Sequence, residues 1–144
     1  MKARWIVLAL LCLSMVLIGA DEQAHTIPVL LPSGTKIMAE VADTPPKRLL
    51  GLMFRDQLSL NSGMLFIFED ADYHGIWMKN CRIALDILWL DKNRRVIHME
   101  EKAPPCLADS CRTYYPAQKA LYVLELNAGL IEREKIGLGA HLKF

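Results

Sequence analysis

Short strand-like segments, separated by turn-forming residues, run through the chain from His25 to Phe144. In residues 35–42 the side chains of Ile37, Ala39 and Val41 point one way, and those of Lys36, Met38 and Glu40 the other, which is typical of a strand. No regular series of crossover helices separates the segments, so a doubly wound parallel sheet is not expected. The pattern instead predicts a mainly β domain, either a sandwich or a partly open barrel, with two short helices.

The expected elements follow from the same apolar runs and turn formers. The expected strands cover residues 25–31, 35–42, 64–68, 75–80, 83–90, 95–101, 121–126 and 138–144. The first two should form a hairpin, and the turn at 91–94 should join a second one. Thr44 and Pro45 begin a short helix expected to end near Arg55, and Asn127 caps another over residues 128–135. The acidic stretch 69–72 predicts a surface loop. A calcium-binding loop is the alternative, disfavoured because the stretch lacks the glycine and final glutamate of an EF-hand.

The first twenty residues have the pattern of a secretion signal. Lys2 and Arg4 are followed by an apolar run over residues 6–18 and by the small residue Ala20. The run is too short to span a bilayer comfortably. We therefore expect cleavage after Ala20, a single domain over residues 21–144, and an exported protein, periplasmic or secreted, without a stable membrane anchor. Lipidation of Cys12 is the alternative, disfavoured because a large residue precedes it.

The charge balance argues against a nucleic-acid partner. The chain has 17 basic and 16 acidic residues, and loss of the signal would leave 15 basic residues and a net charge of −1. Bulk nucleic-acid binding needs a basic surface. A hydrophobic content of 53% also argues against disorder.

The cysteines suggest one disulfide. Cys106 and Cys111 lie close together in a stretch rich in turn formers, and in an oxidising compartment they should pair. A redox-active pair is the alternative, although such pairs usually have the tighter C-x-x-C spacing. Cys81 lies in an apolar, strand-like stretch, which predicts a buried thiol and leaves a reactive one as the alternative.

Several short motifs occur in a distinctive order. They are GLMFR at 51–55, GMLF at 63–66, WMKN at 77–80, LDI at 85–87 and YVLEL at 122–126. With this combination the chain resembles the prokaryotic domain-of-unknown-function family 192 from about residue 25 to the end. The resemblance implies a compact, mostly β, jelly-roll-like fold with a short helix carrying the GLM segment, and it implies no established activity. Cys81 and His141 depart from the family pattern, so neither is expected to carry a shared mechanism.

Two carboxylates lie in apolar surroundings. Asp86 and Glu125 are each flanked by apolar residues, and a carboxylate in such company needs a partner when it is buried. We expect Glu125 to contact Arg55, Lys79 or Asn80 directly. Arg55 is read either as one half of a structural salt bridge or as an anion-binding group. A separate hypothesis makes Asp86 and Glu125 the general acid and base of a hydrolytic enzyme.

Aromatic side chains near these motifs suggest a groove. An exposed Trp77, with Tyr114 covering the groove mouth, would suit stacking on a flat ligand, whereas ordinary core packing is the alternative. The candidate ligand-binding residues are Arg55, Trp77, Asn80, Asp86, Tyr114 and Glu125.

No cofactor motif stands out. The four histidines are scattered, and the pairing of His98 with Glu100 on one strand face lacks a third ligand, so no metal and no cofactor are expected. The sequence leads to the hypothesis of an exported module that binds a small polar ligand or a segment of a protein partner. A structural or interaction domain and a carboxylate-based hydrolase are the alternatives.

Overall fold

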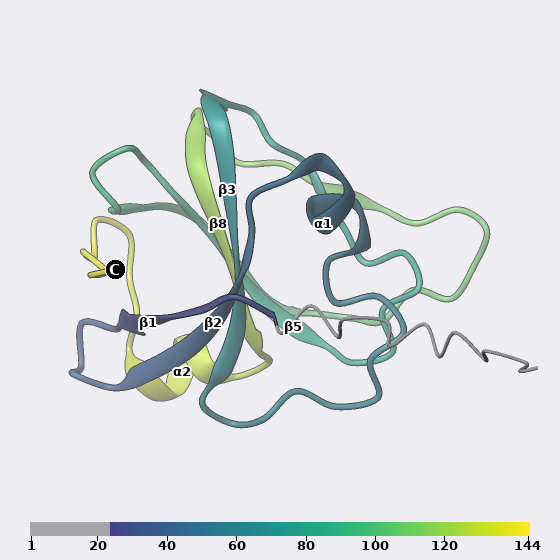
Figure 1. The fold of residues 1–144 in the computed structure, drawn as a ribbon, viewed down its shortest axis with the longest axis horizontal. Helices are drawn as coiled ribbons and strands as arrows, with labels where there is room; N and C mark the ends of the chain where they lie inside the picture. Colours follow the sequence, from purple (N-terminus) through teal and green to yellow (C-terminus); the bar gives the residue numbers. More distant parts are fainter. Residues whose placement is uncertain (1–23) are drawn as a thin grey trace, which may run out of the picture.

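A computed structural model describes residues 24–144, and a six-stranded mixed sheet forms its centre (Figure 1). The strand order in this sheet is β1-β2-β3-β8-β5-β6, and β4 and β7 form a separate two-stranded sheet. The strands are β1 (Thr26–Leu30), β2 (Lys36–Ala42), β3 (Ser62–Asp72), β4 (Ile76–Trp77), β5 (Leu85–Leu90), β6 (Val96–Ala103), β7 (Thr113–Tyr114) and β8 (Ala120–Asn127). The expected signal segment lies outside the described residues.

The sheet combines two predicted hairpins with one parallel pair. β1 with β2, and β5 with β6, are antiparallel neighbours, which confirms both hairpins. β2 and β3 run parallel, and the chain between them contains the helix α1 (Pro45–Leu50). β8 lies between β3 and β5 and is antiparallel to both. The prediction of a mainly β domain with two short helices is thus confirmed, and the sheet does not close into a barrel.

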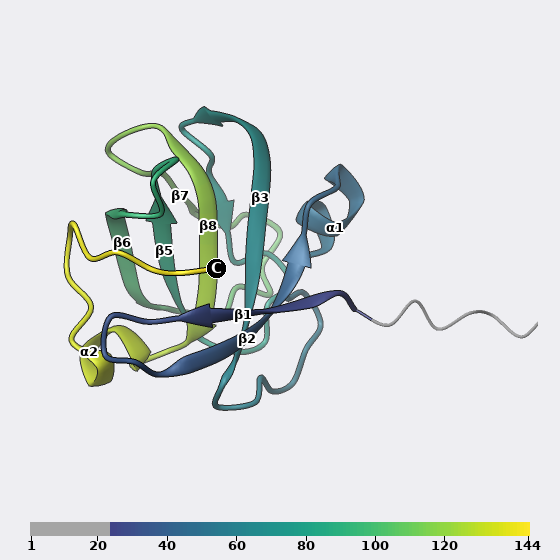
Figure 2. The same cartoon turned by 60° about the vertical axis from the view of Figure 1, so that its left-hand side comes forward.

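Each face of the sheet packs against a separate apolar core, and different segments of the chain cover the two faces (Figure 2). On one face the apolar core includes residues of α2 (Leu130–Glu134) and Leu142, near the C-terminus. On the other it includes Leu52, which follows α1, and residues of the small sheet. All six residues of β5 are buried, which explains the nearly continuous apolar sequence of this strand. Within residues 24–144 no helix is long and apolar enough to cross a membrane.

The first helix begins as predicted and ends sooner. The Thr44 hydroxyl accepts a hydrogen bond from the Lys47 amide, and Pro45 follows it, so the predicted start is confirmed. The helix ends at Leu50 rather than near Arg55, because Gly51 adopts a φ of 49° that side-chain-bearing residues rarely take. The turn after Gly51 directs Leu52 into the core, where it is 1% exposed.

The strand expected over residues 75–80 is shortened to the two residues of β4. Two other expected elements differ from the structure. Residues 69–72 belong to β3, where Asp72 pairs with Ala120 after an irregularity in the ladder, so the prediction of a loop there was wrong. Residues 138–144 form only isolated bridges, Leu30 with Lys143 and Arg95 with His141, instead of a regular strand. Backbone pairing with distant residues decided both cases, and sequence pattern does not reveal it.

The glycine of the GMLF motif is required by packing between strands. A Cβ atom on Gly63 would lie 2.7 Å from the carbonyl oxygen of Glu125 in the neighbouring strand. No real Cβ atom tolerates that distance to a backbone atom, so the close approach of β3 and β8 needs glycine here.

The predicted disulfide between Cys106 and Cys111 is present, and Cys81 is a free, buried thiol. The loop that the disulfide closes is also held by Lys79, whose ammonium donates to the carbonyl oxygens of Ala108 and Asp109 at 2.7 and 3.0 Å. Lys79 therefore holds the disulfide loop and is not the partner of Glu125 that the sequence suggested.

Alkylation of the native, unreduced protein should leave all three of these cysteines unmodified. Cys106 and Cys111 are oxidised, whereas Cys81 is 4% exposed and burial raises the pKa of its thiol to about 11. Peptide mapping by mass spectrometry after iodoacetamide treatment measures this. Unfolding without reductant should expose Cys81 alone. Ready labelling of Cys106 or Cys111 under that condition would contradict the disulfide.

Candidate functional site

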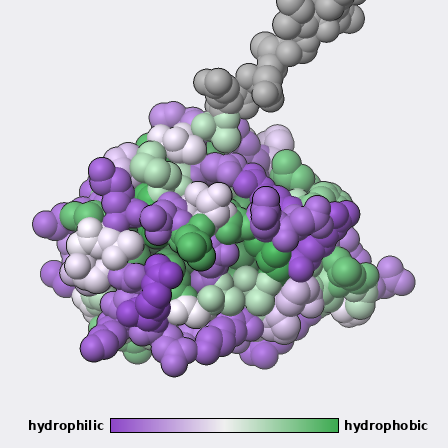
Figure 3. All heavy atoms as spheres, turned by 90° about the horizontal axis from the view of Figure 1, so that it is seen from below, coloured by the Kyte–Doolittle hydropathy of each residue, from purple (hydrophilic) through white to green (hydrophobic). Residues whose placement is uncertain are grey.

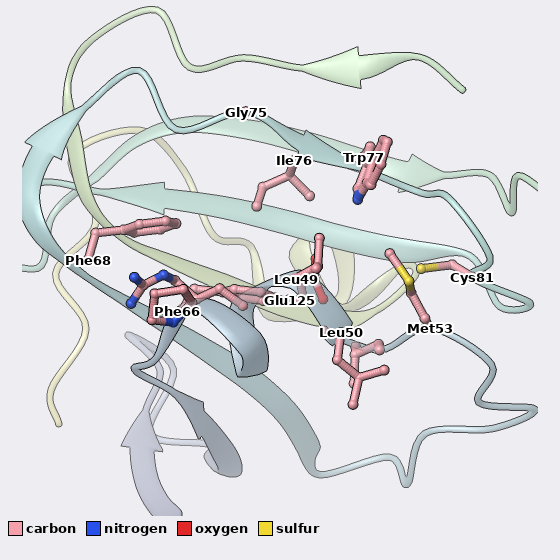
Figure 4. Close-up of a pocket in the computed structure, with 14 residues that line it drawn as sticks. Leu49, Leu50, Met53, Phe66, Phe68, Gly75, Ile76, Trp77, Cys81 and Glu125 are labelled. Atoms are coloured by element: carbon pink, nitrogen blue, oxygen red, sulfur yellow. The ribbon is translucent and has the colours of Figure 1, made fainter. Parts of the chain in front are cut away.

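A cleft of about 330 Å³ opens on the face of the sheet that α1 borders. Its lining comes from α1 and the following turn, from β3, β4 and β8, and from the chain after β4. The lining residues are Pro45, Arg48, Leu49, Leu50, Gly51, Leu52, Met53, Phe66, Phe68, Gly75, Ile76, Trp77, Cys81 and Glu125. Figure 4 shows Phe68 at one end of the cleft and Met53 with Cys81 at the other. The walls are therefore mostly apolar, and Glu125 is their one carboxyl group.

Glu125 is an isolated carboxyl group in the floor of this cleft. It lies on β8 between Met64 of β3 and Ile87 of β5, and it is only 4% exposed. Within the described chain no hydrogen-bond donor reaches its Oε2 atom. Burial raises the pKa of Glu125 to about 8, and the positive charge of Arg55 opposes this shift without cancelling it. At neutral pH the carboxyl is mostly protonated, so it is able to donate as well as accept a hydrogen bond.

The thiol of Cys81 belongs to the same cleft. Burial raises its pKa to about 11, and the negative charge of Glu125 acts in the same direction. A thiol with this pKa stays protonated at neutral pH and is a weak nucleophile. The structure therefore favours the predicted buried thiol over a reactive cysteine.

Arg55 pairs with Glu40 rather than with Glu125. Both guanidinium Nη atoms donate to the Glu40 carboxylate, with an Nη2–Oε2 distance of 2.7 Å. The hydrogen bonds from Arg55 lower the pKa of Glu40, whereas Glu125 feels Arg55 only through its charge. The expected direct contact between Glu125 and Arg55, Lys79 or Asn80 was therefore wrong. Glu40, which lies next to Met64 on the same face of the sheet as Glu125, binds the arginine instead.

Asn80 contacts the turn after α1, which forms one wall of the cleft. Its backbone has a φ of 56°, and its carbonyl oxygen accepts a hydrogen bond from the Phe54 amide at 2.8 Å. Its side-chain amide lies 4.0 Å from the sulfur of Met53. The GLMFR and WMKN motifs thus contact each other directly. This contact holds the turn after α1 against the segment that carries Trp77, which is 45% exposed at the cleft.

Asp86 lies on the opposite face of the sheet from Glu125. Adjacent positions in a strand alternate between faces, and Asp86 pairs with Leu126 whereas Ile87 pairs with Glu125. The Asp86 oxygens accept hydrogen bonds from the backbone amides of Lys102 and Ile131, both at 2.8 Å. The two carboxylates therefore do not share a site, and the acid–base pair considered from the sequence does not form.

Asp86 also replaces the predicted cap of the second helix. α2 begins at Leu130 after Gly129, whose position has no side-chain cap, and Asn127 lies too early to provide one. The Asp86 carboxylate instead takes the amide of Ile131 in the first turn. This cap comes from a residue 45 positions earlier in the chain, which local sequence signals do not report.

Tyr114 lies away from the cleft. It is 7% exposed, belongs to the core on the same face as Glu125, and carries the guanidinium of Arg112 over its ring at 4.6 Å. The structure thus brings Trp77 and Glu125 together in the cleft lining. Arg55 and Asn80 lie behind this lining and contact residues next to it. It leaves Asp86 and Tyr114 in other surroundings.

Sequence reasoning missed most of the cleft wall. Phe66 and Phe68 come from β3, and Leu49 and Met53 come from α1 and its turn. Phe66 belongs to the GMLF motif and Met53 to the GLMFR motif, so the motifs themselves carried a signal. An apolar pattern in the sequence predicts burial, and it does not distinguish residues in the wall of a cleft from residues in the core.

A family model for DUF192, described as "Uncharacterized ACR", matches residues 29–144. The chain belongs to the DUF192 family. A UPF0127 protein of Pyrococcus furiosus is 30% identical over 118 residues, covering 77% of this chain and 91% of the relative. A UPF0127 protein of Pyrococcus horikoshii is 31% identical over 109 residues, covering 72% and 84%.

Two solved structures resemble this DUF192 chain. A protein of unknown function from Novosphingobium aromaticivorans aligns with a TM-score of 0.77 and 31% identity, covering 87% of this chain and 89% of that one. A putative transcription regulator from Sinorhizobium meliloti aligns with a TM-score of 0.74 and 31% identity, covering 83% and 94%. The fold and the family are therefore shared, and the first of these proteins is itself of unknown function.

Proposed function

We propose that this DUF192 chain is an exported binding module that holds a small ligand in the cleft over Glu125. The observation that carries the proposal is the buried Oε2 atom of Glu125, which has no partner in residues 24–144 and lies in the floor of an open cleft. A buried polar atom without a hydrogen-bond partner destabilises the fold. A bound molecule that donates a hydrogen bond to Glu125 would offset that cost.

The shape of the cleft indicates what kind of ligand fits. A volume of about 330 Å³ suits a molecule of small-metabolite size rather than a folded domain. Phe66 and Trp77 offer aromatic surface for an apolar body, and Glu125 offers the polar contact that orients it. The ring of Phe68 is already stacked against His74 and lies under the Arg48 guanidinium. Export is supported by the secretion-signal pattern of residues 1–20 and is compatible with the disulfide.

Replacing Trp77 with alanine should weaken ligand binding about tenfold without loss of the fold. Trp77 is half exposed, so its removal costs contact area for the ligand more than core packing. Screening a library of small aromatic and aliphatic compounds by amide NMR shifts would identify ligands whose shifts cluster at Phe66, Trp77 and Glu125. Tyr73→Ala is the matched control, because Tyr73 is an exposed aromatic residue that does not line the cleft. The proposal fails when no compound shifts the cleft residues, or when both variants bind alike.

A second candidate function is docking of a partner segment. Leu49 and Leu50 in the cleft wall and Phe54 just after it are each more than half exposed. Seen from below, the surface is mostly hydrophilic, with small groups of hydrophobic side chains between (Figure 3). Phe54 does not line the cleft, so Phe54→Ser should leave small-ligand binding unchanged and weaken the docking of such a segment.

A further inference from the structure

The chemical class of the ligand follows from what surrounds Glu125. A carboxyl group in an apolar cavity is stabilised by hydrogen-bond donors or by a positive charge, and none of the described residues gives its Oε2 atom a donor. The neighbouring thiol of Cys81 is at best a weak donor. The cleft thus provides an acceptor and leaves the donor to the bound molecule.

The two arginines near the cleft are already engaged. Arg55 is held by both oxygens of Glu40. Arg48 donates to the carbonyl oxygens of Asp43 and Ile67, both at 2.8 Å, and stacks over the ring of Phe68 at 5.1 Å. Neither guanidinium makes a hydrogen bond to Glu125, so within residues 24–144 the carboxyl has no directly bonded counter-charge.

The walls of the cleft suit a cation with a hydrocarbon body. Faces of tryptophan and phenylalanine rings attract positive charge, and Arg48 over Phe68 shows this contact within the same cleft. Phe66 and Trp77 are the further aromatic rings in the lining, and Met53 adds a polarisable thioether. Aromatic walls recur in sites that bind organic ammonium ions, and a carboxylate beside them adds an opposite charge.

Building on the proposed function, we propose that the ligand is a small organic ammonium ion whose N–H groups donate to Glu125 and whose hydrocarbon body packs against Phe66 and Trp77. A neutral molecule that accepts a hydrogen bond from protonated Glu125 is the competing class, and the experiment separates the two.

The test compares two probes of the same shape. Phenethylamine carries an ammonium group where phenethyl alcohol carries a hydroxyl, and their dissociation constants for the full-length protein are measured by calorimetry at about pH 8.5. The amine should bind at least about tenfold more tightly than the alcohol. The preference should vanish in Glu125→Gln and persist in Glu101→Gln, a matched control at an exposed position on β6.

The pH dependence gives a second, independent measurement. The charged or titratable groups around Glu125 are Arg55 after α1, Arg48 on α1, Cys81 after β4, and Glu40 behind Arg55. Of these, Cys81 stays protonated and Glu40 stays ionised through the neutral range, because their pKa values are raised and lowered respectively. Since the pKa of Glu125 is about 8, amine affinity should rise about 20-fold between about pH 6.5 and about pH 8.5. The same titration of Glu125→Gln separates the contribution of Glu125 from that of all other groups.

The outcomes are distinct. Equal affinity for the alcohol and the amine, or an affinity that falls as pH rises, overturns the ammonium class and leaves a small-ligand site standing. Failure of every compound, charged or neutral, to shift the cleft residues overturns both the ammonium class and the proposed function. If Glu125→Gln does not fold, the comparison of the two probes on the unaltered protein and on Trp77→Ala decides the matter, since Trp77→Ala should weaken the amine about tenfold.

Discussion

Replacing Asp86 with alanine is expected to lower the free energy of unfolding by about 4 kcal/mol. The Asp86 carboxylate is completely buried and accepts hydrogen bonds from the amides of Lys102 and Ile131. Each buried donor left without an acceptor costs about 1–3 kcal/mol, and the removed side chain also leaves a cavity. Urea unfolding, followed by far-ultraviolet circular dichroism, measures the loss.

Asp91→Ala is the matched control for this prediction. Asp91 also accepts two backbone amides, those of Asn93 and Arg95, but in an exposed turn where water replaces the carboxylate. This change should cost about 1 kcal/mol. Asp86→Asn should fall between the two alanine variants, because one amide oxygen replaces two carboxylate oxygens. A loss for Asp86→Ala no larger than that for Asp91→Ala would mean that the buried bonds do not stabilise the link between β5 and α2.

The case of Asp86 shows how far the sequence predicts local structure here. An aspartate between apolar residues predicts burial with a partner, and that requirement is met. The partner is the backbone of β6 and α2 rather than a charged side chain. Only the register of β5 with β6, and the position of α2 beneath them, bring those amides into reach. Spacing along the chain does not contain that information.

The same division applies to the cleft. The alternation of residues in β2 predicted its inward face correctly, since Ile37 and Ala39 are fully buried. It also placed Glu40 on the opposite face of β2, yet gave no reason to connect it with Arg55. That pairing depends on the parallel alignment of β2 with β3 and on the early end of α1 at Gly51. The turn at Gly51 thus helps to place Arg55 beside Glu40, whereas the sequence predicted Glu125 as its partner.

Replacing Glu125 with glutamine should stabilise the protein at neutral pH, by about 3 kcal/mol at about pH 7. Had Glu125 formed the expected buried ion pair, this change would destabilise the fold, because an unpaired cation would remain. The structure reverses the sign, since Arg55 is bound to Glu40 and burial raises the pKa of Glu125 to about 8. Glutamine keeps the shape of the side chain and removes the charge that burial disfavours.

The pH dependence of this stabilisation identifies its origin. The folded pKa of Glu125 lies above its value of about 4.5 in the unfolded chain, so its contribution to stability is fully present below about pH 4.5 and is lost as pH rises through about 8. Glutamine does not titrate, so the two proteins should be equally stable near about pH 4 and diverge up to about pH 8. Glu40 and Glu134, whose pKa values are lowered, act oppositely in acid but are common to both proteins and cancel in the difference. Urea unfolding at several pH values, with Glu101→Gln as the exposed control, measures the divergence. A Glu125→Gln protein less stable than the unaltered chain at neutral pH would show that the carboxylate has a stabilising partner in the protein. Glu125 would then not need a ligand as its hydrogen-bond partner, and the proposed function would lose its main support.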